Sequence, residues 1–120
     1  MRPKHLDQLA SIILDFTVDV MKASDRASSD PQATLLLHQL VRTTLAAGSS
    51  YRWGRRASHK REFINRLSVS RAEFEEITAW LEMVAARHDD EVWQRSLATA
   101  RNINQILIAS LDKARQRTKE

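Results

Sequence analysis

The residues best suited to binding chemistry are the basic side chains that crowd the middle of this sequence. Residues 52–71 contain seven Lys or Arg and a single Glu, which gives a net charge of +6. Arginine presents a planar fork that donates two hydrogen bonds to phosphate oxygens, so such a cluster is typical of a surface that binds a nucleic-acid backbone without reading its sequence. We expect six side chains to contact phosphates: Arg52, Arg55, Arg56, Lys60, Arg61 and Arg66.

Two aromatic residues, Tyr51 and Trp53, lie beside these bases and offer faces on which unpaired bases could stack. The charge then reverses, because residues 72–92 contain seven Asp or Glu against one base, Arg87, for a net charge of −6. A second interpretation follows from this reversal. The two halves could pair with neighbouring helices, with other subunits, or with a partner enzyme, and the protein would then be an interaction scaffold. The sequence leaves both interpretations open.

Metal and catalytic chemistry lack the residue patterns that they need. Carboxylate metal sites in helical bundles use Glu-x-x-His pairs, and no histidine here has a Glu three residues before it or a second His within a turn. There is no cysteine, no glycine-rich phosphate loop and no nucleophile elbow. We therefore predict a protein that is not an enzyme and that uses neither a metal nor a cofactor. The histidines considered are His5, His38, His59 and His88.

Composition sets the fold class. Two glycines and two prolines in 120 residues favour long helices with few turns and argue against a sheet. The net charge of +4 and an isoelectric point near 10.0 are consistent with an anionic partner. Asp7, Asp15 and Asp19 interrupt the apolar residues of the N-terminal region, so neither a signal peptide nor a membrane span is expected. We predict an all-α cytoplasmic protein with no membrane partner.

Apolar residues recur at spacings of three and four in four segments, as in amphipathic helices. Asp30-Pro31 and Asp89 to Glu91 are typical helix starts, and Ser58 is the expected cap of the third helix after a break at 53–58 centred on Gly54. The expected helices are 4–23, 31–52, 59–87 and 90–115. Short connections make consecutive helices antiparallel, which predicts a single domain, 1–120, folded as an up-down-up-down four-helix bundle.

Two tryptophans, Trp80 and Trp93, lie near the apolar stripes of the third and fourth segments without occupying their strictest positions. If the apolar faces of the helices in the bundle core are wide, both tryptophans could be part of that core. Burial against another subunit would explain them equally, since tryptophan is enriched in interfaces. With the resemblance described next, we favour the second interpretation and expect both side chains at an oligomer interface.

Three stretches of the chain follow a known pattern: QLVRTT at 39–44, GRRASHKREF at 54–63 and RAEFEEI at 71–77. In these stretches and in its helix plan the sequence resembles the four-helix bundle family of 23S rRNA-intervening sequence proteins. It departs from the family at Gly48, where the family has proline, and at Ser50 and Trp53, where the family has asparagine and glutamate. The resemblance implies a closed homopentamer. A related branch with a similar arrangement of helices comprises the accessory proteins of diversity-generating retroelements. Similarity to that branch implies that nucleic acid and a reverse transcriptase are partners.

Overall fold

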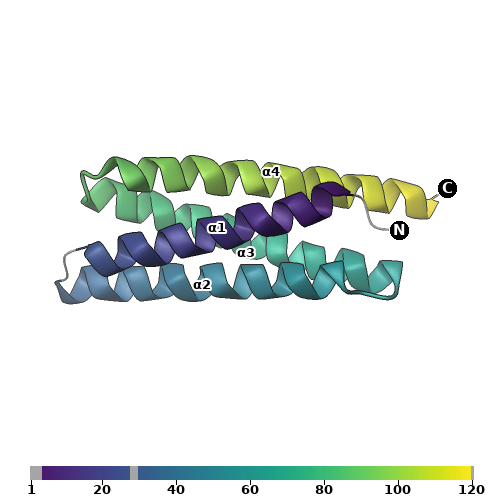
Figure 1. The fold of residues 1–120 in the computed structure, drawn as a ribbon, viewed down its shortest axis with the longest axis horizontal. Helices are drawn as coiled ribbons and strands as arrows, with labels where there is room; N and C mark the ends of the chain where they lie inside the picture. The colour runs from purple at the N-terminus through teal and green to yellow at the C-terminus, as the bar shows by residue number, and fades with distance from the viewer. Residues whose placement is uncertain (1–3, 28–29, 120) are drawn as a thin grey trace.

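The computed structural model describes residues 4–27 and 30–119, and within them every regular element is a helix. Four helices follow in order: α1 (Lys4–Arg26), α2 (Pro31–Arg55), α3 (Lys60–Arg87) and α4 (Glu91–Lys119). They lie lengthwise in a rod of 52 × 20 × 19 Å, with consecutive helices running in opposite directions (Figure 1). The predicted all-helical architecture of four helices is therefore confirmed.

The core runs along the inside of this rod. Helix α2 packs most extensively on α3, and α1 contacts α2 and α4 while crossing them at a visible tilt (Figure 1). Across the middle, the ring of Phe16 on α1 meets that of Phe74 on α3, with centroids 5.9 Å apart. The largest fully buried side chains come from all four helices: Leu9, Val20, Leu40, Tyr51, Leu67, Phe74, Ile77, Leu81, Val84, Trp93, Ile103 and Leu107.

Helix α2 begins as its sequence indicates. The Oδ1 atom of Asp30 accepts a hydrogen bond of 2.8 Å from the backbone N–H of Ala33, and Pro31 follows in the first turn. Asp30 also pairs with Arg87 at the end of α3, at 3.0 Å. The Ala33 hydrogen bond, with help from the charge of Arg87, lowers the pKa of the Asp30 carboxyl. This cap is complete at neutral pH and is lost as the pH falls through that lowered pKa.

The junction between α2 and α3 differs from the sequence prediction. Helix α2 continues through Gly54 to Arg55, so the expected end at residue 52 and a break centred on Gly54 are wrong. The cap position of α3 is His59 rather than Ser58, and the His59 side chain makes no capping hydrogen bond. Gly54 remains helical because α3 lies directly against it. A methyl group on Gly54 would lie 2.6 Å from Cδ1 of Leu67.

Replacing each of the two glycines of α2 with alanine should therefore change the free energy of unfolding in opposite directions. At Gly48 the added methyl would lie 3.6 Å from Cγ2 of Ile13, an ordinary contact, so Gly48→Ala should stabilise by about 0.5–1 kcal/mol through helix propensity. At Gly54 the methyl meets the fully buried Leu67, and an overpacking cost of about 1–3 kcal/mol outweighs that gain. Urea denaturation of both variants measures the contrast. Stabilisation by Gly54→Ala would show that the junction is loosely packed.

None of the helices in the described ranges combines the length and the apolar character that crossing a lipid bilayer requires.

Candidate nucleic-acid interface

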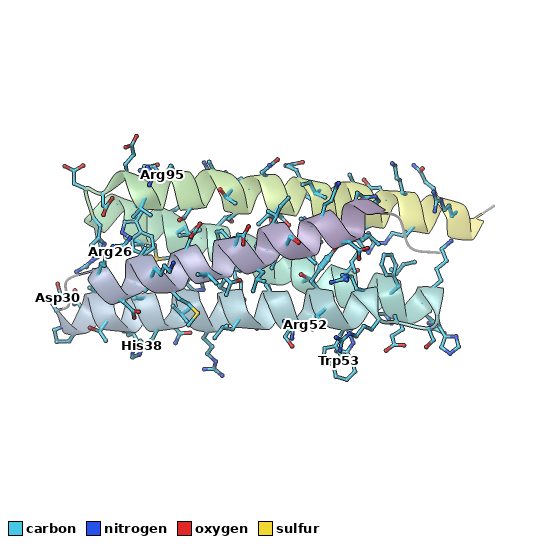
Figure 2. The ribbon with its side chains drawn as sticks, in the orientation of Figure 1. Arg26, Asp30, His38, Arg52, Trp53 and Arg95 are labelled. Carbon is cyan, nitrogen blue, oxygen red and sulfur yellow. The ribbon has the colours of Figure 1, made fainter. Side chains whose placement is uncertain are left out.

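The predicted phosphate-binding residues gather where α2 ends and α3 begins. The antiparallel hairpin places the last turns of α2 beside the first turns of α3, so bases that are up to 14 positions apart share one end of the rod. Figure 2 shows the side chains of Arg52 and Trp53 projecting outward from α2, away from the other helices. We call this surface the basic corner and define it by its exposed members: Arg52, Trp53, Arg56, Lys60, Arg61 and Arg66.

The bases of this corner have no carboxylate partner within the part of the chain that the structure describes. The described ion pairs instead use Arg55, Arg71, Arg87, Arg95 and Arg101. Five cationic side chains of the corner are thus solvent-exposed and uncompensated: Arg52, Arg56, Lys60, Arg61 and Arg66. Like charges gathered in this way create a positive potential that attracts anions, most strongly at low salt.

Trp53 is the aromatic member of the corner. Its side chain is 57% exposed, which is unusual for tryptophan in a monomeric surface. The guanidinium carbon of Arg66 lies 4.9 Å from the centroid of the indole ring, so the two groups form a cation–π pair between α2 and α3. A cation–π contact uses none of the guanidinium N–H groups as hydrogen-bond donors to a carboxylate, so Arg66 can still donate to phosphate oxygens.

Arg55 does not belong to this exposed group. Its Nη2 atom donates a hydrogen bond of 2.9 Å to Oδ1 of Asp7 on α1, and 30% of its side chain is exposed. Arg55 therefore has a carboxylate partner, which the other five predicted phosphate ligands lack among the described residues. The pair holds the beginning of α1 against the end of α2. The two residues are 48 positions apart in the sequence. The residue pattern within a single helix therefore could not predict this ion pair.

Tyr51 is also not a stacking residue. Its side chain is 1% exposed, and its hydroxyl donates a hydrogen bond of 2.6 Å to the backbone carbonyl of Leu6. Burial raises the pKa of Tyr51 far above its usual value, so the hydroxyl keeps its proton and remains a donor. Tyr51 faces the core because it falls one turn after Ala47 on the buried side of α2, whereas Trp53 falls on the opposite side.

Of the two tryptophans expected at an oligomer interface, Trp93 is buried inside its own chain. It is 1% exposed, and its ring centroid lies 6.2 Å from that of His88 at the α3–α4 turn. The interface prediction for Trp93 is therefore wrong. Trp80 is partly buried and packs against the core cluster. Other apolar residues are the ones that remain exposed. Their positions fall outside the three-and-four spacing of the core residues, and this is the feature of the sequence that could have identified them. The residues more than 40% exposed are Ile12, Leu14, Met21, Leu35, Leu45, Trp53, Val69 and Met83.

The acidic segment 72–92 is compensated more fully than the basic corner. Glu82 pairs with Arg101 on α4 at 3.1 Å, and Glu75 pairs with Arg71 one turn earlier at 3.1 Å. Glu73 accepts a hydrogen bond of 2.7 Å from the hydroxyl of Ser50. These contacts support the interpretation that the acidic half of α3 is used within the chain. None of these carboxylates pairs with the five exposed Lys and Arg side chains of the basic corner.

No group of three or more His, Cys, Asp or Glu side chains in the described ranges is arranged to hold a metal ion. An open hollow of about 550 Å³ lies on α3 beside the basic corner, and its charged and amide lining consists of Arg61, Glu62, Asn65 and Arg66. The corner therefore combines cationic side chains, an amide, an exposed indole and a shallow depression. These groups suit hydrogen bonding and stacking on a flexible anionic strand.

Comparison with known proteins gives one structural likeness of high quality. No family model and no curated protein matches the sequence. Among solved structures, a protein of unknown function from the S23 ribosomal protein family of Bacteroides thetaiotaomicron superposes with a TM-score of 0.80. The two sequences are 20% identical, and the match covers 89% of this chain and 97% of the other. The likeness shows the fold, and its family is consistent with the one that the sequence resembles.

Proposed function

We propose that this protein is a non-enzymatic, oligomeric helical bundle that binds nucleic acid through the basic corner without strong sequence preference. The observation that carries the proposal is the set of five exposed cations without a carboxylate partner, one of which, Arg66, lies over the exposed indole of Trp53. Such groups neutralise phosphates and stack on bases, whereas sequence reading requires side chains held rigidly against base edges. Exposed arginines at helix ends are better suited to neutralising phosphates than to reading base edges.

The proposal includes membership of the 23S rRNA-intervening sequence family, a cytoplasmic location and assembly into a homopentamer. Support for family membership comes from the motif resemblance and from the structural neighbour. Support for assembly comes from the exposed apolar side chains of α1 and α2, including Leu14, Leu35 and Leu45. Five chains of charge +4 would together carry +20, a field that attracts polyanions strongly at low salt.

A second candidate function is an accessory subunit for a partner enzyme such as a reverse transcriptase. The observation in its favour is a hollow between α1 and α2 in which Met21, Val41 and Leu45 present apolar surface. Apolar grooves rimmed by polar residues are typical of protein docking sites. A protein partner held there would leave the basic corner free, so the two functions are compatible.

The decisive experiment removes two corner charges that have no structural partner. In the double variant Arg52→Gln and Arg61→Gln, affinity for single-stranded RNA and DNA should fall about tenfold or more. The slope of log affinity against log salt should become less steep by about 1.4, because each of the two lost phosphate contacts accounts for about 0.7 of the slope on a single strand. The loss should be the same for strands of different sequence. Fluorescence anisotropy titrations at several salt concentrations measure both quantities.

A matched control removes the same charge from the far end of the rod. Lys22 and Arg95 line a hollow between α1 and α4, and Figure 2 places Arg95 toward the end opposite Trp53. The variant Lys22→Gln and Arg95→Gln should keep most of the affinity and the salt slope. Equal losses in the two double variants would show that net charge rather than the corner carries binding. Unchanged affinity in the corner variant would remove the proposal altogether.

A further inference from the structure

A second cationic feature lies at the same end of the rod as the basic corner and shares Lys60 with it. It is a hollow of about 660 Å³ at which the beginning of α1, the α2–α3 connection, the beginning of α3 and the end of α4 converge. Figure 1 shows these four segments at one end of the molecule. We call it the end hollow. Its polar lining includes His5, Ser58, His59, Lys60, Lys113 and Arg117.

The charge of the end hollow has one sign. Lys60, Lys113 and Arg117 are permanent cations, and the imidazoles of His5 and His59 add donors. None of the described residues that line it is an Asp or Glu. Lys113 and Arg117 are four residues apart and so lie on one face of α4. Residues from widely separated parts of the sequence therefore bring at least three positive charges to one cavity.

Two further properties suit this cavity to anions. The first N–H groups of α3 have no acceptor within the helix, and the His59 side chain at the cap position does not supply one. Apolar side chains complete the lining, namely the buried Leu6 and the partly buried Phe63. These apolar side chains offer a surface on which a group attached to an anion can pack.

We infer that the end hollow binds a phosphomonoester. A phosphomonoester carries up to two negative charges whereas an internal diester carries one, so three cations on one hollow favour the monoester. The volume falls within the range of ordinary small-molecule sites and leaves room for a nucleoside against the apolar wall. The group could come from inorganic phosphate, from a mononucleotide or from the phosphorylated end of a strand, and that last source rests on the proposed function.

The test compares probes that differ in this one group. Two oligonucleotides of identical sequence, one with a 5′-phosphate and one with a 5′-hydroxyl, are titrated into the full-length protein, alongside inorganic phosphate and adenosine monophosphate. The 5′-phosphorylated strand should bind about tenfold more tightly, the effect expected of a charge-assisted hydrogen bond to the terminal group. Lys113→Gln with Arg117→Gln should abolish that preference and leave the affinity for the 5′-hydroxyl strand unchanged.

The control is again Lys22→Gln with Arg95→Gln, which should keep the preference. Binding of adenosine monophosphate or phosphate that is lost in the Lys113/Arg117 variant supports the end hollow even if no strand binds, in which case the proposed function alone fails. Equal binding of the two strands, together with no binding of the small probes at millimolar concentration, overturns the inference and leaves the basic corner intact. Equal loss of both strands in the variant also overturns it, because ordinary backbone contacts would then explain the charges.

Discussion

Replacing Trp93 with alanine should lower the free energy of unfolding by about 3–5 kcal/mol, the usual cost of removing a large aromatic side chain from a core. The side chain is 1% exposed and lies in the first turns of α4, where it packs near His88 and closes the α3–α4 end of the core. An alanine there leaves a cavity that helix ends cannot fill without shifting. Equilibrium unfolding in urea, followed by circular dichroism, measures the change.

The other tryptophans are controls for this result. Trp80→Ala removes a partly buried side chain and should cost less than Trp93→Ala. Trp53→Ala removes a side chain that is 57% exposed and should change stability by less than about 1 kcal/mol, since it loses mainly one surface cation–π contact. A Trp93→Ala variant that keeps wild-type stability but no longer associates would contradict the buried position and restore its role at an interface.

The second large effect is expected at Phe74. Its side chain is fully buried on α3, and its ring meets Phe16 of α1 across the centre of the core at 5.9 Å. Phe74→Ala should cost about 3–5 kcal/mol of unfolding free energy. Helices α1 and α3 occupy diagonal positions, so this pair is the direct aromatic link between them. Losing it should loosen α1 more than it loosens the α2–α3 hairpin.

A double-mutant cycle separates the ring contact from simple burial. Phe16→Leu and Phe74→Leu keep apolar volume while removing one ring each, and their combination should show a coupling of about 0.5–1.5 kcal/mol. Strict additivity of the two changes would show that the rings fill space without interacting. Both measurements use the same urea titrations, and Met83→Ala, at a side chain that is 49% exposed, provides a surface control.

The sequence predicts the helices well because their buried positions recur regularly. Leu6, Leu9, Ile13, Phe16 and Val20 follow one another at spacings of three and four, and all five are buried. The start of α2 at Asp30 could also be predicted, because a capping Asp followed by Pro is local chemistry. Patterns of this kind depend on residues within a turn or two of each other.

The junction could not be predicted, because its structure depends on contacts between helices. Glycine normally indicates a break, but Gly54 continues α2 where Leu67 of α3 leaves no room for a side chain. The different roles of Tyr51 and Trp53, and the pairing of Arg55 with Asp7, likewise follow from how α1 crosses α2. The sequence alone locates the basic region. The fold determines which of its side chains lack a carboxylate partner, and it forms the end hollow from three distant stretches of the chain.

The antiparallel arrangement of the helices affects how the protein orients while it diffuses toward a charged partner. Each helix lies beside neighbours of opposite direction, so the dipoles of the four backbones largely cancel. The side-chain charges do not cancel, since free bases occupy one end of α3 and the acidic residues Asp89, Asp90 and Glu91 follow its other end. The rod of 52 Å therefore carries an electric dipole along its length. A polyanion attracts the basic end of such a rod more strongly than the acidic end, which favours encounters in which the basic end faces the polyanion.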